Sequence, residues 1–402
     1  MKAGRDPFEV KDDIYWVATL DPELKIFDII MRTAHGSTYN SYLVKGTNKK
    51  AIIDAVKEPF FEGFLENLEK LNVKPEEIDY LVVNHNEPDH SGALPKLLEY
   101  MPNVTLIVSK QGKVFLDNII NNKDFKCIEA DDNLEIDLGG KTLKFIIAPF
   151  VHWPDTMFTY IPQSKVLFTC DFLGSHFCDE RMIDTQVEDF SEDFRFYFDG
   201  IMRPFKEYVL QHIEKIEKLD IDIIAPSHGP ILTQPKHYIE LYKKWSQPMQ
   251  EKLAAVLYVS AYGYTKKLAQ EIARGIQSEG VKVITKDIVD VIEKEKPYLL
   301  DTVQRASLVA VGSPTINGDA VEPIWEFLSS LATIKIRGKM GFAFGSFGWS
   351  GEASKLITQR MKDIKFTMPL EPFRIRFRPT DQDLQKAFEI GKQLAQKVKE
   401  MP

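Results

Sequence analysis

The chain has 402 residues, an apolar content of 44% and a formal net charge of −8 at pH 7. This length exceeds what one hydrophobic core usually covers, so two domains are expected. The sequence has no Lys/Arg block interleaved with aromatic residues, no apolar run of the roughly 20 residues that span a bilayer and no signal-peptide pattern, so we expect a cytoplasmic protein without nucleic-acid or membrane partners.

The first half of the chain predicts hairpins followed by alternating strands and helices. A β-rich segment covers 13–20, and the apolar segments 39–46 and 49–56 flank a polar turn at 46–48, which is typical of a β-hairpin. Strands and helices are then predicted at 61–73 (helix), 78–85 (strand), 93–101 (helix), 104–110 (strand), 134–173 (several strands), 205–219 (helix) and 222–230 (strand). This mixture indicates a two-sheet core flanked by helices.

Beyond about residue 250 the pattern becomes a regular alternation of strand and helix. Continuous apolar strands are predicted at 253–260, 282–288, 306–313 and 339–346, and helices at 265–280, 322–331, 352–361 and 383–399. Repeated βα units with continuous apolar strands indicate a doubly wound parallel sheet. We therefore predict an α/β protein with domains at 1–250 and 251–402.

Four residues with metal-ligand side chains follow the predicted strand in LVVNHNEPDHSG (81–92): His85, Glu87, Asp89 and His90. A polar loop that caps the next helix is the alternative interpretation. Three further strand ends carry residues of the same kind, APFVHWPD with His152, LFTCDFLG with Asp171 and IIAPSHGP with His228. Because strand ends on one side of a sheet line the functional crevice of an open β/α architecture, their recurrence predicts a two-metal centre.

The ligand types restrict the metal. Histidine and carboxylate without thiolate suit iron, manganese or zinc, and Cys127, Cys170 and Cys178 form no C-x-x-C pair. We expect these cysteines to be small buried apolar groups rather than ligands of a zinc knuckle or a rubredoxin-like iron site. Three carboxylates balance two divalent ions and one hydroxide, so a buried site would be close to neutral.

The first half resembles the metallo-β-lactamase fold, whose hydrolases carry H-x-H-x-D-H. Here Glu87 replaces the second histidine, and H-x-E-x-D-H followed by single His, Asp and His residues is similar to the flavodiiron (A-type flavoprotein) family. The resemblance covers nearly the whole chain, includes HWPDTMFTY (152–160), and implies the minimal two-domain class without a rubredoxin extension. It implies an amino-terminal metallo-β-lactamase-like αββα sandwich, followed by a flavodoxin-like sheet.

The resemblance also implies a ligand set for two irons. His85, Glu87 and His152 would bind one iron, Asp89, His90 and His228 the other, and Asp171 would bridge them. In some family members the residue at the position of His90 is turned away from the metal.

Other polar residues near these motifs have weaker signals. His176 could orient a ligand or simply pack, and Tyr197 is a further candidate, with a core aromatic as the alternative. The family implies that the loop with His35 approaches the metals. Asp28-Ile29-Ile30 stands where many relatives have a pocket histidine. Two further histidines in charged helical segments are expected to face solvent, His212 and His237.

Three turns in the second half resemble the flavin loops of flavodoxin. SAYGYT (260–265) lacks both the P-loop and the dinucleotide glycine patterns, but the hydroxyls of Ser260 and Thr265 with helix-start N–H groups can hold a monophosphate. Ordinary helix capping is the alternative. The implied cofactor is FMN, and the candidate contacts are Ser260, Tyr262, Gly263, Tyr264, Thr265, Ser313, Pro314, Thr315, Asn317, Gly318, Ser346, Phe347, Gly348, Trp349 and Gly351.

The combination predicts an oxidoreductase that reduces O2 to water and/or NO to N2O, with FMN relaying electrons from an external donor. That donor would be a rubredoxin-like protein or a reduced deazaflavin. The family implies a head-to-tail homodimer, or a dimer of such dimers, in which the flavin of one subunit approaches the irons of the other. Two alternatives remain at this point: a dizinc hydrolase with a flavodoxin domain, and a non-catalytic flavin electron carrier.

Overall fold

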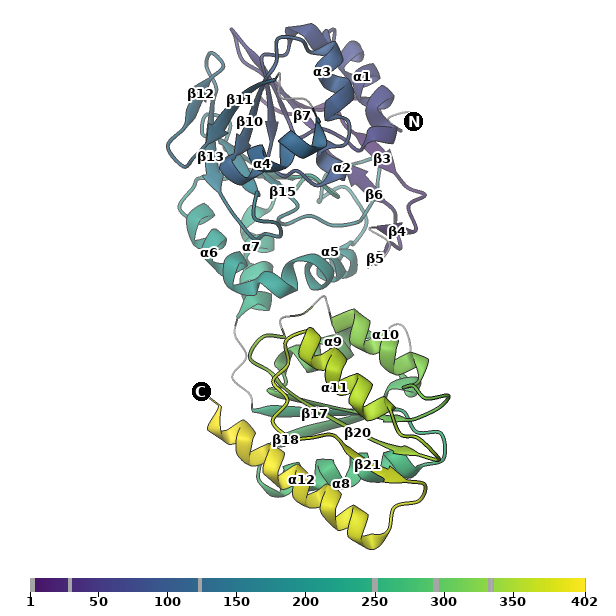
Figure 1. The fold of residues 1–402 in the computed structure, drawn as a ribbon. Helices are drawn as coiled ribbons and strands as arrows, with labels where there is room; N and C mark the ends of the chain where they lie inside the picture. The colour runs from purple at the N-terminus through teal and green to yellow at the C-terminus, as the bar shows by residue number, and fades with distance from the viewer. Residues whose placement is uncertain are drawn as a thin grey trace. The chain divides into compact units, whose positions relative to one another are not determined.

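The structure is a computed structural model that describes residues 4–27, 31–121, 125–247, 252–291, 296–331, 334 and 336–401. The chain divides into two compact units, residues 1–247 and 248–402 (Figure 1). The predicted boundary near residue 250 falls in a segment outside the described residues, as do Asp28, Ile29 and Ile30. None of the helices in the described part of the chain combines the length and hydropathy needed to cross a bilayer.

The first unit is built on two sheets. A seven-stranded sheet has the order β1 (Phe8–Lys11), β2 (Ile14–Trp16), β7 (Tyr42–Lys45), β8 (Lys50–Ile53), β9 (Tyr80–Val83), β10 (Thr105–Ser109) and β11 (Lys126–Ala130). A five-stranded sheet has the order β12 (Glu135–Asp137), β13 (Thr142–Ile147), β14 (Met157–Ile161), β15 (Val166–Cys170) and β16 (Ile223–Pro226). One continuous hydrophobic core includes residues of both sheets, which confirms the predicted two-sheet core.

Helices flank this pair of sheets (Figure 1). The helices are α1 (Phe61–Lys70), α2 (Pro88–Ser91), α3 (Leu94–Tyr100), α4 (Lys110–Ile119), α5 (Ser191–Tyr197), α6 (Lys206–Ile216) and α7 (Pro235–Ser246). In Figure 1, α1, α3 and α4 lie on one side of the unit and α5, α6 and α7 on the other, as in an αββα sandwich.

The hairpin predicted between 39 and 56 is present, but its strands β7 and β8 are shorter than the predicted segments 39–46 and 49–56. β7 and β8 pair antiparallel, and the Gly46 N–H donates to the Lys49 carbonyl at 2.9 Å. The chain turns a corner at Asn40, whose side chain accepts a hydrogen bond from Trp16. Beyond this corner two short strands form a separate small sheet, β3 (Thr19–Asp21) and β6 (Ser37–Tyr39), and β4 (Ile26–Phe27) and β5 (Met31–Arg32) form another.

The second unit is the predicted doubly wound sheet. Its parallel strands have the order β18 (Lys282–Asp287), β17 (Leu253–Tyr258), β19 (Leu308–Pro314), β20 (Met340–Phe347) and β21 (Phe373–Arg376). Side chains of β17 alternate between two cores, so helices cover both faces of the strand and its sequence is apolar throughout. The helices are α8 (Tyr264–Ser278) and α12 (Asp381–Glu400) on one face, and α9 (Lys296–Arg305), α10 (Glu322–Ser330) and α11 (Ala353–Asp363) on the other.

This strand order fixes where a ligand can bind in the second unit. β18, the next strand in the sequence after β17, lies on one side of β17, and β19 lies on the other side. The direction of winding therefore reverses between β17 and β19. In open α/β sheets, ligands bind outside the carboxyl ends of the strands at such a reversal. The three predicted flavin loops follow β17, β19 and β20 and therefore lie at this end of the sheet.

Candidate diiron and flavin sites

The metal-ligand side chains come from the ends of strands in both sheets of the first unit. β9 ends at Val83, and Pro88 starts α2 directly after Glu87, so Asp89 and His90 lie on the first helical turn. His152 lies between β13 and β14, Asp171 follows β15, and His228 follows β16. The loop after β9 is held by the buried carboxylate of Asp54, which accepts the Asn84 N–H at 2.7 Å.

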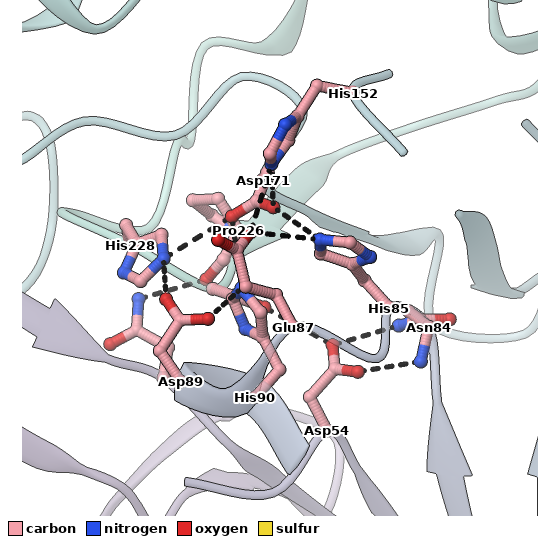
Figure 2. A network of polar contacts seen from close by, with 12 residues as sticks. Asp54, Asn84, His85, Glu87, Asp89, His90, His152, Asp171, Pro226 and His228 are labelled. Carbon is pink, nitrogen blue, oxygen red and sulfur yellow. Dashed lines mark hydrogen bonds and ion pairs between the residues drawn. The ribbon is translucent and has the colours of Figure 1, made fainter. Parts of the chain in front are cut away.

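Two groups of side chains converge in this region, and Asp171 joins them (Figure 2). In the first group, Glu87 Oε2 lies 3.2 Å from both His85 Nε2 and His152 Nε2. Asp171 Oδ2 lies 3.5 Å from His85 Nε2 and 3.3 Å from His152 Nε2. One carboxylate oxygen of Asp171 thus faces this group.

The other oxygen of Asp171 faces the second group. Asp171 Oδ1 lies 3.2 Å from His90 Nε2 and 3.3 Å from His228 Nε2. Asp89 completes the group, with Oδ1 at 3.3 Å from His90 Nε2 and Oδ2 at 3.0 Å from His228 Nε2. A carboxylate whose two oxygens face separate sets of nitrogen and oxygen ligands has the geometry of a bridge between two ions.

The spacing of these atoms fits metal ligation better than direct hydrogen bonding. Buried atoms of the second group have no hydrogen-bond partner of acceptable geometry, although they lie within ion-pair distance of one another: both carboxylate oxygens of Asp89, and Nε2 of His90 and His228. Ligand atoms about 2.1 Å from one ion lie about 3.0 Å apart in an octahedron and about 3.4 Å apart in a tetrahedron. The observed separations match these edges, so the residues fit a pair of ions.

Cys170 is also within reach of His90 and Asp171. Burial raises the pKa of its thiol well above the usual value, so the thiol stays protonated and is a poor ligand. The prediction that all three cysteines are buried is wrong for Cys127 and Cys178, which are half-buried. Cys127 lies on the edge strand β11, where only one side of the strand is covered.

Two histidines are held so that Nε2 points to the metal centre. His85 Nδ1 lies 3.1 Å from Asp155 Oδ1, and His228 Nδ1 lies 2.6 Å from the Thr38 carbonyl oxygen. An acceptor at Nδ1 keeps the proton there and leaves Nε2 free to ligate. The sequence reasoning missed Asp155, which is buried and lies three residues after His152.

The imidazoles and carboxylates of the two groups shift one another's pKa values. Burial alone would lower the pKa of His152, but the nearby carboxylates of Asp171 and Glu87 raise it to about 9. Burial likewise lowers the pKa of His228, while the nearby carboxylates of Asp171 and Asp89 raise it to about 10. Although burial raises the pKa of Asp171, the charge of His90 and the close contacts with His152 and His228 hold it well below its usual range.

The remaining polar candidates lie at different distances from this centre. Tyr197 is buried and donates its hydroxyl to Asp171 Oδ1 at 3.1 Å. His176 is buried, with its Nδ1 2.8 Å from Ser37 Oγ and its ring 5.2 Å from that of His228. His35 instead pairs with Asp193 at 3.0 Å on the surface.

The expectation that His212 faces solvent is wrong, whereas His237 is exposed. His212 lies on the buried face of α6, where its Nε2 donates to the Pro149 carbonyl oxygen at 2.9 Å. Burial lowers the pKa of its imidazole. Its role is to join α6 to the loop that leads to His152.

The first flavin loop connects β17 to α8. Gly263 has a φ of 78°, a left-handed conformation that glycine adopts without strain, and it directly precedes Tyr264, the first residue of α8. The Ser260 hydroxyl accepts the Lys266 N–H at 3.2 Å. Thr265 is buried, and its hydroxyl lies 2.9 Å from that of Ser346 at the end of β20. Hydroxyls and N–H groups thus gather at the start of a helix, where phosphate binds readily.

The other two loops form small turns, and the third loop carries an exposed aromatic residue, Trp349. Ser313 and Pro314 end β19, Thr315 donates its N–H to the Ser346 carbonyl, and Asn317-Gly318 form a tight turn with positive φ at both residues. After Phe347 ends β20, the third loop includes Gly348, Trp349 and Gly351. Tyr262 on the first loop is 84% exposed, and Trp349 is 77% exposed. Two large aromatic side chains are thus available on these loops for contact with a flat ring.

Comparisons with known proteins agree with both units. A family model described as ODP family beta lactamase matches residues 38–229, and one described as Flavodoxin matches residues 256–391. The Flavo-diiron protein FprA2 of Clostridium acetobutylicum is 42% identical over 97% of this chain and 99% of its own length. A Nitric oxide reductase of Moorella thermoacetica is 33% identical over 98% of this chain and 99% of its own length.

A solved structure extends the agreement to the fold. The rubredoxin oxygen:oxidoreductase of Desulfovibrio gigas superposes with a TM-score of 0.78 at 26% identity, over 98% of this chain and 99% of that one. The fold and the comparisons define a two-domain oxidoreductase with a metallo-β-lactamase-like and a flavodoxin-like domain. The chain belongs to the flavodiiron protein family, whose cofactors are a diiron centre and FMN.

Proposed function

We propose that this protein reduces a small diatomic gas, O2 to water and/or NO to N2O, at two irons held by the seven converging side chains. The placement of Asp171 between the two groups supports this proposal most directly. Two ferrous ions would supply an open coordination position and two electrons, and reduced FMN would supply two more. Four electrons are what the conversion of O2 to water requires, whereas two NO molecules need two.

The protein's own residues would hold and shield the centre. His85, Glu87 and His152 would ligate one ion, Asp89, His90 and His228 the other, and Asp171 both. Asp155 and the Thr38 carbonyl would keep the ring protons of His85 and His228 on Nδ1. The centre is mostly buried, so the ligand charges are largely removed from bulk water.

In the second unit, we assign phosphate binding to Ser260 and Thr265, and the flavin ring to the loops after β19 and β20. Domains at 1–250 and 251–402 would thus each carry one cofactor. Titration of the flavin-free protein with FMN tests this assignment. One FMN per chain is expected, and two or none would contradict it.

The charge distribution supports a head-to-tail dimer. Residues 1–247 contain 28 Lys and Arg against 41 Asp and Glu, whereas residues 248–402 contain 23 against 18. The net charges are therefore −13 and +5, and the flavin unit of one copy is electrostatically complementary to the metal unit of another. A dimer of such dimers would use the same contact. Analytical ultracentrifugation should show an even oligomer, and an active monomer would contradict the arrangement.

The external donor would be a rubredoxin-like protein or a reduced deazaflavin. Anaerobic stopped-flow measurement tests the function itself: fully reduced protein is mixed with O2 and with NO in separate experiments. At least one gas should reoxidise both cofactors within the turnover time, and an Asp171→Asn protein that retains FMN is the matched control. Failure of both gases to reoxidise the wild-type protein would contradict the proposal.

A further inference from the structure

The bridging carboxylate has unequal surroundings on its two oxygens. Oδ1 accepts a hydrogen bond from the Tyr197 hydroxyl at 3.1 Å. No hydrogen bond of this kind reaches Oδ2 within the described residues, and Oδ2 faces only His85 and His152. The phenol therefore acts on the oxygen that faces His90 and His228, and not on the other.

The local structure leaves just enough room for this phenol. A Cβ atom added to Gly174 would lie 3.1 Å from the Asp171 backbone carbonyl oxygen, 3.2 Å from Tyr197 Cζ and 3.3 Å from the Tyr197 hydroxyl oxygen. Such distances are shorter than ordinary van der Waals contact, so a side chain at this position would displace the phenol, the backbone of Asp171, or both. The ring of His176 lies against Tyr197 from another direction, with the ring centroids 4.9 Å apart.

A charged clamp, formed by Asp199 with Arg195 and Arg203, holds the backbone that carries Tyr197. α5 continues directly into a π-helical turn (Phe198–Met202), a rare geometry that is often found at functional sites. Asp199 in this turn accepts hydrogen bonds from Arg195 Nε and Arg203 Nε, each at 3.0 Å. The Arg203 side chain is 1% exposed, so the Asp199–Arg203 pair is shielded from water.

We propose that Tyr197, positioned by Asp199, Arg203 and the space at Gly174, makes the two metal positions unequal in affinity. The ion between Asp89, His90 and His228 is held more weakly than the ion between His85, Glu87 and His152. This inference rests on the ligand assignment of the proposed function. It assigns Tyr197 and the clamp a positioning role that acts through Asp171.

The basicity of the two Asp171 oxygens decides which metal position binds its ion more weakly. A hydrogen bond to an ionised oxygen stabilises its negative charge and lowers its affinity for a proton. The same lone-pair density binds a metal ion, so Oδ1 is the weaker donor and Oδ2 the stronger. The position that faces Oδ1 is therefore filled second and emptied first.

Stepwise loading of the metal-free protein with Co2+ tests the inference without an activity assay. The Nδ1 protons of His85 and His228 bond to different acceptors, so their hyperfine-shifted NMR signals report the two positions separately. In the wild-type protein the His85 signal should appear at lower Co2+ concentration than the His228 signal. The affinity gap is the ratio of the Co2+ dissociation constants of the two positions. In Tyr197→Phe this ratio should fall about fivefold, the size expected for the loss of one hydrogen bond.

Three further variants separate positioning from general stability. Gly174→Ala and Asp199→Asn should each narrow the gap as Tyr197→Phe does, and neither should change it further when combined with Tyr197→Phe. Tyr160→Phe removes another largely buried hydroxyl, which donates to the Asp220 carbonyl, and should leave the gap unchanged. If Asp199→Asn does not fold, Tyr197→Phe with Tyr160→Phe as its control still tests the role of Tyr197.

Two outcomes would overturn the account at different levels. Equal affinities in the wild-type protein, or a gap that Tyr197→Phe and Gly174→Ala leave unchanged, would overturn the role of Tyr197 while the ligand assignment stands. If Co2+ shifts neither histidine signal, the assignment of these residues as ligands fails, and the inference fails with it.

Discussion

Asp155→Asn should weaken iron binding although Asp155 is not itself a proposed ligand. The Asp155 residue is 1% exposed, its two carboxylate oxygens lie 3.1 and 3.2 Å from His85 Nδ1, and Oδ2 accepts the Asn86 N–H at 2.7 Å. An asparagine keeps one acceptor oxygen, which the Asn86 N–H occupies, and it turns its NH2 group toward His85. His85 must then accept at Nδ1 and carry its proton on Nε2, where it blocks the metal.

The expected loss is about 10- to 100-fold in iron affinity, the usual effect of removing such a partner. This corresponds to about 1.4–2.8 kcal/mol of binding free energy. Anaerobic competition against a chromophoric Fe2+ chelator measures it. Asp193→Asn is the matched control, because Asp193 forms the same kind of contact with His35 on the surface. The reasoning is refuted if Asp155→Asn binds iron as tightly as the wild-type protein, or if the control loses as much.

Other predictions concern protons, flavin and metal choice. With pKa values raised to about 9 for His152 and about 10 for His228, both rings are protonated at pH 7 when no metal is bound. Although burial lowers the pKa of His85, contacts with Asp155 and Glu87 raise it well above its usual value, so Fe2+ loading should release at least two protons. Calorimetry in buffers of different protonation enthalpy measures the number, and zero release would contradict the shifts. Because the pKa values of His152 and His228 lie above 7, iron affinity should rise with pH until about 9–10. Thr265→Val should weaken FMN binding about tenfold by fluorescence titration, whereas the equally buried Thr302→Val should not. Glu87→His recreates the hydrolase pattern and should raise the zinc-to-iron ratio in protein loaded from an equal mixture, and an unchanged ratio would remove Glu87 as the basis of metal choice.

The sequence predicts most of the fold because each main strand has a clear apolar pattern. Strands β17, β19 and β20 are continuous apolar runs, since helices cover both faces of the sheet. The edge strands β11 and β21 were not predicted: β11 is only partly buried, and β21 alternates arginines with buried residues over four positions. Helix α4 was also missed, although Ser109 caps it by accepting the Gly112 N–H.

The candidate ligands could be predicted because metal-binding residue types recur after apolar strands. Their partners could not, because the contacts join segments far apart in the chain. Asp155 meets His85 from 70 positions away, and Tyr197 meets Asp171 from 26. His212 was placed on the wrong side because charged neighbours on α6 hide the fact that its own face packs against Pro149. Such partners follow from the packing of loops against strand ends, which no local pattern records.

Anomalous diffraction at the iron edge, from crystals of anaerobically reconstituted protein, tests the central claim most directly. Two iron peaks about 3.5–4 Å apart are expected, one beside His85, Glu87 and His152 and the other beside Asp89, His90 and His228, with one oxygen of Asp171 directed at each. A single peak, or iron bound away from these side chains, would contradict the account.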